Sequence, residues 1–330
     1  MSVVCQTAFG QQRPQYSQYM MNNFVLNPAI AGIEDYADLK TGYRNQWTGF
    51  GGEPTTYYLS GHWALNKPDL TSRGITPVRG QKPNIKLTNR FVRVPSHTGL
   101  GGLFVSDKAG AFARTTFSLS LAKHIQLQNT MKVSLGVSAG ITQNSIDFDQ
   151  ITLANPSDPL NQSGKINGYQ PELNVGVWLY DRDFYVGASA NQVALNNLGF
   201  GDILPNQKEY AWQGKSQTHY FLTGGIRREI NEDWALAPSL MLKYTQGSPV
   251  SFDVNAKMYY LDRFWLGTSY RHQDAFVGLL GFHVNSTFNI GYSYDFVFSN
   301  INLAARASHE IVVGIMLNNR QKVVCPVNMW

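Results

Sequence analysis

Residues 286–298 contain the feature that most constrains the fold, an alternation of large apolar side chains with small or polar ones. Every even position from 288 to 298 is aliphatic or aromatic, whereas odd positions such as Ser293 and Asp295 are polar or small. Successive side chains of a β-strand point to opposite faces, so this segment has one apolar and one polar face. Its length is close to the roughly 9–11 residues that a tilted strand needs to cross a bilayer. The pattern predicts a membrane β-barrel.

The composition agrees with a barrel and argues against other classes. A chain of 330 residues could form two soluble domains or one large barrel. It has no run of about 18 or more apolar residues, which excludes a helical membrane protein. Aromatic residues make up 13% of the chain, which suits the girdles of a barrel, and charged residues make up 15%. The net charge of +5 is not clustered as in nucleic-acid-binding proteins.

The sequence predicts about fourteen strands, and thus an all-β fold, a transmembrane antiparallel β-barrel. Alternation is clearest at 114–124, 131–142 and 251–260, besides 286–298. An even number of strands brings both ends of the barrel to one side of the membrane. The other strands are expected near 36–46, 55–65, 97–107, 169–180, 183–192, 217–229, 234–245, 263–272, 274–284 and 308–317.

Connection lengths predict which rim faces outward. Short turns are expected at 181–183, 231–233 and 261–263, at alternate connections and therefore at one rim. The opposite rim has longer connections, near 143–168 and 193–216. Outer-membrane barrels have long extracellular loops and short periplasmic turns, which fixes the expected orientation.

The long loops contain apolar side chains among polar neighbours, as interfaces do. We expect them to bind a partner protein, and an alternative is that they pack on one another as a lid. The candidate binding residues are Phe148, Phe200, Tyr210 and Trp212.

The connection at 65–96 is unusually long for the periplasmic rim, and it has seven basic residues against one acid. It is either a solvated insertion or a docking surface for an anionic periplasmic partner, with binding that weakens with salt. The candidate docking residues are Arg79, Lys82, Lys86 and Arg90.

The ends of the chain predict secretion and a plug. Residues 1–10 resemble the end of a signal peptide, and the alternative is a lipoprotein anchored through Cys5. Fourteen strands enclose a lumen wider than that of eight-stranded barrels, which side chains fill, and narrower than that of porins with 16–18 strands. We therefore expect part of residues 11–33 to plug the barrel, which spans 34–318, and residues 319–330 to form a periplasmic tail.

The sequence offers no catalytic or metal-binding pattern, so we expect neither an enzyme nor a cofactor. Ser308, His309 and Glu310 cannot converge, because neighbours on a strand point to opposite faces. Charged residues within the strands should face the lumen, since Lys or Arg facing lipid at mid-depth costs about 2–4 kcal/mol. We expect them to pair with one another or, alternatively, to line a substrate pathway. They are Lys40, Arg44, Lys132, Arg227, Lys243, Asp253, Lys257, Arg271 and Asp295.

Several short motifs resemble the PorP/SprF family of Bacteroidetes outer-membrane proteins. At the N-terminal end these are residues 15–20 (QYSQYM), 26–32 (LNPAIAG) and 43–50 (YRNQWTGF). Further matches follow in the family's order, at Asp107–Gly110, Tyr270–Arg271, Gly291–Asp295, Ser308–Glu310 and Cys325–Pro326. The 65–96 connection is longer than is usual in the family.

The resemblance implies a role in the type IX secretion system, in which similar proteins support gliding motility and the export or surface attachment of adhesins. The expected partners are the C-terminal region of a secreted adhesin and the periplasmic ring and lipoprotein components of the machine. The expected location is the outer membrane. An outer-membrane channel or hydrophobic-solute transporter is the alternative, because it would have the same strands.

Overall fold

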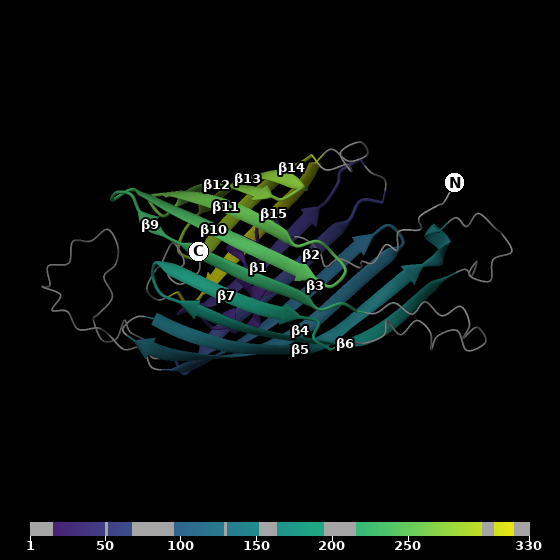
Figure 1. Cartoon of the computed structure of the whole chain (residues 1–330), viewed down its shortest axis with the longest axis horizontal. Coiled ribbons are helices and arrows are strands. Elements are labelled where there is room, and N and C mark those ends of the chain that lie inside the picture. Colours follow the sequence, from purple (N-terminus) through teal and green to yellow (C-terminus); the bar gives the residue numbers. More distant parts are fainter. Residues whose placement is uncertain are drawn as a thin grey trace, which may run out of the picture.

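The alternating segments form a closed antiparallel barrel in the computed structural model, which describes residues 16–49, 52–67, 96–128, 131–151, 164–194, 216–298 and 307–319 (Figure 1). Within these residues, each long strand pairs with its neighbours in the chain, and the last strand pairs with the first to close the cylinder. The two-residue β9 (Arg228–Glu229) continues the line of β8 along β10. The prediction of an all-β barrel of about fourteen strands is confirmed.

The fourteen long strands lie close to the ranges expected from the sequence, and β4, β5 and β6 are longer than expected. Their bounds are β1 (Ala37–Asn45), β2 (Thr55–Leu65), β3 (His97–Ala109), β4 (Phe112–Gln128), β5 (Met131–Asp147), β6 (Lys165–Tyr180), β7 (Phe184–Asn191), β8 (His219–Ile226), β10 (Trp234–Thr245), β11 (Ser251–Tyr260), β12 (Phe264–Arg271), β13 (Ala275–His283), β14 (Phe288–Val297) and β15 (Ala307–Leu317).

The wall is apolar outside and polar inside, the reverse of a soluble protein. On β4, Phe117, Leu119 and Leu121 are exposed on the outer face, whereas Ser118 and Ser120 between them are buried in the lumen. Aromatic pairs such as Trp234 and Tyr260, with ring centroids 4.6 Å apart, lie on the outer surface. An apolar belt with aromatic residues is the surface that a bilayer covers. No helix of the described residues is long and apolar enough to cross a membrane.

Two strand prolines lie at positions where their strand gains or changes its pairing partner on one side. β6 pairs with β5 over its whole length, but it pairs with β7 only from Asn174 onward. The carbonyl of Leu173 accepts from Val193 on the β7 side, so the nitrogen of Pro171, two residues earlier, faces that side as well. Its missing N–H therefore costs no bond to β5. Pro238 lies where the partner of β10 changes from β8 to β9.

Turn conformations at the short-turn rim, formed by connections such as 181–183, 230–233 and 261–263, fit the predicted hairpins. Leu261 and Asp262 both have positive φ, and the N–H of Arg263 donates to the carbonyl of Tyr260 at 3.0 Å. Such turns match the right-handed twist of the flanking strands. The opposite rim, called the long-loop rim here, includes connections 148–164 and 192–218. Parts of both connections lie outside the described residues.

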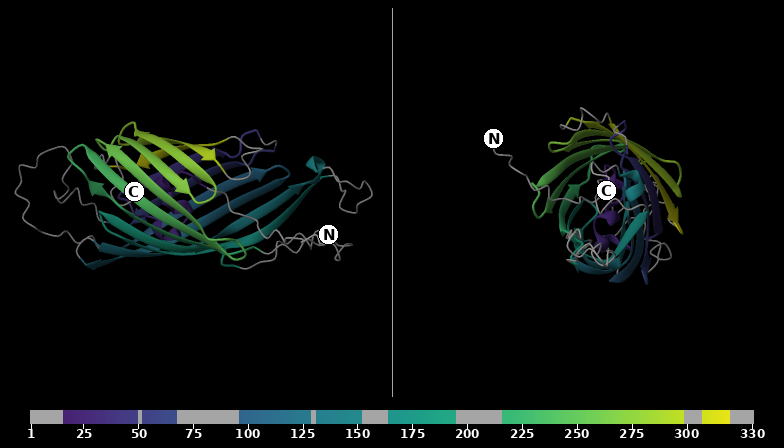
Figure 2. Two further views of the ribbon diagram at one scale, coloured as in Figure 1. Left: turned by 45° about the horizontal axis from the view of Figure 1, so that its top comes forward. Right: turned by 90° about the vertical axis from the view of Figure 1, so that its right-hand side faces the viewer.

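Residues 16–36, called the plug here, lie inside the barrel (Figure 2). Seen along the barrel, this purple segment is enclosed by the strands. The buried hydrophobic cluster consists of the plug and the inward side chains that it touches. The plug thus forms an apolar core together with the apolar side chains of the inner wall. Residues 11–15 lie outside the described part of the chain.

The outer face of β4 provides a test of the predicted membrane depth. We expect Leu119→Arg, at the middle of the strand, to destabilise the barrel by about 2–4 kcal/mol, because a guanidinium there faces hydrocarbon. Leu127→Arg, near the short-turn end of the same face, should cost about 0–1 kcal/mol. Denaturant titration of the protein folded into vesicles measures both. Equal costs for the two variants would contradict the assignment of this face to lipid.

Candidate functional site

The plug contains three single-turn 3₁₀ helices in close succession: η1 (Tyr19–Met21), η2 (Asn23–Val25) and η3 (Pro28–Ile30). Asn27 starts η3, because its side-chain oxygen accepts from the N–H of Ala29 at 2.9 Å. Pro28 takes the first helical position, where its fixed φ suits a helix and no N–H is needed. Short 3₁₀ turns leave many carbonyls without a partner in the segment itself.

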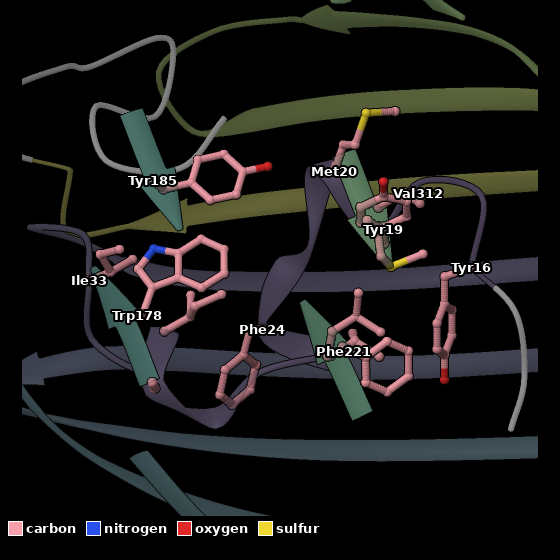
Figure 3. Packing of buried hydrophobic residues seen from close by; sticks show 14 of the residues in the cluster. Tyr16, Tyr19, Met20, Phe24, Ile33, Trp178, Tyr185, Phe221 and Val312 are labelled. Atoms are coloured by element: carbon pink, nitrogen blue, oxygen red, sulfur yellow. The ribbon is translucent and has the colours of Figure 1, made fainter. Parts of the chain in front are cut away.

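Apolar side chains of the plug pack against large residues of the wall (Figure 3). Tyr19 and Phe24 are buried, and the side chain of Ile33 has no exposed area at all. On the wall, the Trp178 and Tyr185 rings stack with centroids 4.7 Å apart. Each fully buried aliphatic or aromatic side chain contributes about 1.5–3 kcal/mol. The plug is therefore packed like the hydrophobic core of a soluble protein.

Glycines of the wall allow the plug backbone to approach closely. A Cβ added at Gly99 of β3 would overlap the Ala31 carbonyl, and one added at Gly136 of β5 would overlap the backbone of Ala29. Gly176 of β6 lies in the same way against the side chain of Asn27. A side chain at any of these three positions would displace the plug, which is the physical reason for glycine there.

Carbonyl groups of the plug accept hydrogen bonds from wall side chains. Met20 accepts from Lys257 at 3.2 Å, and Ala29 accepts from the hydroxyl of Ser134 at 2.6 Å. The Leu26 carbonyl accepts from both Ser189 and Asn191, at 2.8 and 3.0 Å. Buried backbone groups need such partners, and the plug has no neighbouring strand to supply them. The polar inner face of the barrel is therefore a matched receptor for an irregular peptide.

A buried ion cluster holds the N-terminal end of the plug, toward the long-loop rim. Arg44 of β1 contacts Asp295 of β14 at 2.7 Å and Glu310 of β15 at 3.2 Å. Ser17 of the plug lies between them: its hydroxyl donates to Asp295 and its backbone N–H donates to Glu310, both at 2.7 Å. Arg44 in turn donates to the Ser17 hydroxyl at 2.7 Å.

A second arginine extends the ion cluster to β11 and β12. Arg271 lies 3.5 Å from Asp253, 3.1 Å from Asp274 and 3.6 Å from Asp295. The cluster thus joins two guanidinium groups to four carboxyl groups, and the N–H and O–H groups of Ser17 supply further donors to the carboxylates. Ser17 accepts from Arg271 as well as from Arg44. The plug is therefore tied to the cluster by charge-assisted hydrogen bonds in both directions.

Three histidines hold the other end of the plug, toward the short-turn rim. His97 and His124 donate from Nε2 to the carbonyls of Gly32 and Ala31, at 3.1 and 2.8 Å. Nδ1 of His62 accepts from the N–H of Gly32 at 3.3 Å. Nδ1 of His124 lies 2.9 Å from the Tyr180 hydroxyl, which can donate to it. Acceptance at Nδ1 requires that the His62 ring is neutral.

The charged residues that the sequence placed in the lumen do face inward. Arg44, Arg271, Asp253 and Asp295 form the ion cluster, and Lys257 binds the plug. Mutual pairing is therefore established for the four residues of the ion cluster, and Lys257 instead donates to a plug carbonyl. The other charged residues expected in the lumen are buried or half-buried on the inner face: Lys40, Lys132, Arg227 and Lys243.

Most of the predicted partner-binding residues lie outside the described part of the chain: Phe200, Tyr210, Trp212, Arg79, Lys82, Lys86 and Arg90. Phe148 is described and begins the single turn η5 (Phe148–Gln150) above the β5–β6 hairpin at the long-loop rim, where it is half-buried. At the start of the basic connection, Lys67 pairs with Asp35 at 2.5 Å and donates to the carbonyl of Ile33 at 2.8 Å.

The structure places Ser308, His309 and Glu310 as the sequence predicted. Glu310 points into the lumen, whereas His309 contacts Tyr292 at 2.7 Å. In the described residues, no three His, Cys, Asp or Glu side chains converge as metal ligands.

Sequence reasoning missed the uncharged residues that bind the plug. Ser134, Ser189, Asn191, His97 and His124 were not singled out. Their signal was their position: each occupies an inward position of a strand whose outward neighbours are mostly apolar. A polar inner face is equally expected of a water-filled channel, so the pattern alone did not indicate a peptide ligand.

Removal of one guanidinium tests the ion cluster. We expect Arg44→Ala to lower stability by about 3–5 kcal/mol, because Asp295 and Glu310 would remain buried without their main counter-charge. Thermal unfolding, followed by loss of the compact band on unheated gels, measures this loss. Arg182→Ala, at an exposed turn, is the control and should change stability by no more than about 0.5 kcal/mol. Equal melting of both variants would show that the cluster does not stabilise the fold.

The chain is similar to several solved structures and to one protein family. Solved structures similar to the chain include a Pseudomonas aeruginosa FadL homologue, with 12% identity, 94% and 96% of the two chains covered and a TM-score of 0.49. Another is the Ralstonia pickettii toluene transporter TbuX, with 10% identity, 91% and 93% coverage and a TM-score of 0.49. A third is Acinetobacter baumannii Omp33, with 8% identity, 87% and 100% coverage and a TM-score of 0.44.

No match was found among curated proteins. The model of one family, described as type IX secretion system membrane protein PorP/SprF, matches residues 8–315. This range includes the plug, every strand except the last residues of β15, and both arginines of the ion cluster. The protein belongs to the PorP/SprF family of type IX secretion system membrane proteins, and it is an integral β-barrel of the outer membrane.

Proposed function

We propose that the protein is a non-enzymatic scaffold of the type IX secretion system, which supports the export or surface attachment of a partner adhesin of the gliding type. The observation that carries this proposal is the plug. A lumen filled by the protein's own backbone, packed against wall glycines and bonded at both ends, offers a secreted chain no path. The partner is then bound at the rims.

The long-loop rim is the surface that we assign to the adhesin's C-terminal region. Phe148 lies there, and the connection 192–218, which contains Phe200, Tyr210 and Trp212, starts and ends there. Aromatic side chains within a polar surround are the usual energetic centre of an interface. We assign the short-turn rim, where the basic connection 66–96 is attached, to the periplasmic ring and lipoprotein components.

The alternative function, a channel or hydrophobic-solute transporter, requires the plug to leave the lumen or to shift. Contacts of the plug with β1, β3, β4, β5, β6, β7, β11, β14 and β15 would all have to break. The cost of breaking them favours the scaffold. Conductance measurements separate the two functions directly.

We predict that the purified protein does not conduct in planar bilayers, because the plug fills the lumen. Gly136→Leu should produce stable conductance, since a side chain at this position occupies the place of the Ala29 backbone. Gly278→Leu is the matched control, because a Cβ at this outward-facing glycine meets nothing within 4 Å, and it should remain silent. Large, stable conductance of the unmodified protein would contradict the scaffold and favour the channel.

We further predict that replacing Phe200, Tyr210 and Trp212 with Ala removes the cognate adhesin from the cell surface. The barrel itself should still reach the outer membrane and remain heat-modifiable, because none of the three residues belongs to a strand of the described wall. The control replaces Trp234, Tyr260 and Phe264, the same residue types at the opposite rim, and should leave the adhesin displayed. Surface immunofluorescence of intact cells measures display, and normal display in the first variant would refute this site.

A further inference from the structure

A shallow apolar trough of about 480 Å³ crosses the outer wall over β6, β7, β8 and β10. Its sides are aliphatic and aromatic side chains that are exposed on the lipid-facing surface. Its floor is formed by β7, where Ala188 and Ala190 are the outward side chains. The trough lies on the outer face, so it is separate from the lumen and from both rims.

The strand register explains how the trough forms. Two rows of paired residues run across the four strands: Val175, Ala190, Tyr220 and Tyr244 make one row, and Val177, Ala188, Leu222 and Leu242 make the next. In each row the alanine on β7 is the shortest side chain and lies between larger neighbours. Strands are spaced about 4.7–4.9 Å apart, so two spacings separate the backbones of β6 and β8. The space between their side chains is about one hydrocarbon chain wide.

The position of the trough and the chemistry of its lining indicate what kind of ligand it binds. The trough lies within the apolar belt, where the surrounding medium is lipid, and it presents almost no polar surface. At the end nearer the long-loop rim, the Tyr220 and Tyr244 rings stack with centroids 6.0 Å apart. Tyrosines of barrels concentrate at the level of the lipid headgroups. The trough therefore extends from the interface toward the hydrocarbon interior, as a lipid tail does.

We propose that this trough is a binding site for one acyl chain of a membrane lipid, seated on Ala188 and Ala190 with its headgroup end near Tyr220 and Tyr244. The lipid covers the outside of β7, whose inner face donates hydrogen bonds from Ser189 and Asn191 to the plug. It is a resident lipid rather than one of the exchanging annular lipids, because it fills a recess instead of covering a convex surface.

The test uses the full-length protein folded into phosphatidylethanolamine vesicles that contain a small fraction of the same lipid with a photoreactive group in the middle of one acyl chain. After irradiation, mass spectrometry maps the labelled peptides. We expect labelling to be several-fold higher in the peptides of β7 and β8 than in the wall strands that do not line the trough. Ala188→Leu with Ala190→Leu fills the trough and should lower labelling there to the level of the remaining wall.

Ala139→Leu is the matched control, because Ala139 is an outward alanine of β5 outside the trough, and it should leave the β7 and β8 labelling unchanged. Heat-modifiability of all variants shows that each barrel has folded. Equal labelling around the whole barrel, or unchanged labelling in the double variant, would overturn the proposal. Capture of a copurifying protein at β7 in native membranes, in place of lipid, would also overturn it.

Discussion

The contact of Arg44 with Asp295, Glu310 and Ser17 is the interaction on which the rest of the interior depends. It joins the first strand to the last two strands, and it joins all three to the plug. Burying such charges is costly unless they are paired, and here the wall supplies more carboxyl groups than guanidinium groups. The plug adds the N–H and O–H of Ser17 as donors to Glu310 and Asp295. The wall and the plug therefore stabilise each other through one shared set of ion pairs and hydrogen bonds.

This dependence also explains the family resemblance. The motifs that carried it are far apart in the chain, yet Ser17, Asn27, Arg44, Arg271 and Asp295 all contact the plug or form part of it. Glu310 belongs to the same set. The pattern by which the sequence resembles PorP/SprF proteins is thus largely the pattern of a plug and its receptor.

Strand alternation predicted most of the wall, because one side of each strand faces lipid and the other faces the lumen. Leu119 and Ser120, for instance, could be assigned to their faces from the sequence alone. The partners of the lumenal groups could not be predicted, since they depend on which strands lie opposite across the barrel. Arg44 and Asp295 were expected to face inward, but their contact requires the closure of β15 on β1.

Other features of the interior depend on distances that a sequence pattern does not contain. Gly99 is required because the backbone of Ala31 approaches the wall at this position, and this approach joins segments far apart in the chain. His97 and His124 had no signal beyond their inward positions. Their role is set by where Ala31 and Gly32 lie, and no local pattern fixes the path of an irregular segment.

Ser17 and Glu310 are 293 positions apart in the chain, and this separation has a consequence for how the barrel is assembled. Contacts of long sequence separation form late, because the entropy of closing the intervening chain must be overcome first. The pairing of β15 with β1 and the seating of Ser17 both join the two ends of the same polypeptide. Arg44, Ser17 and Glu310 can meet only when β15 lies beside β1. The last contacts of the plug therefore depend on the same closure that completes the wall.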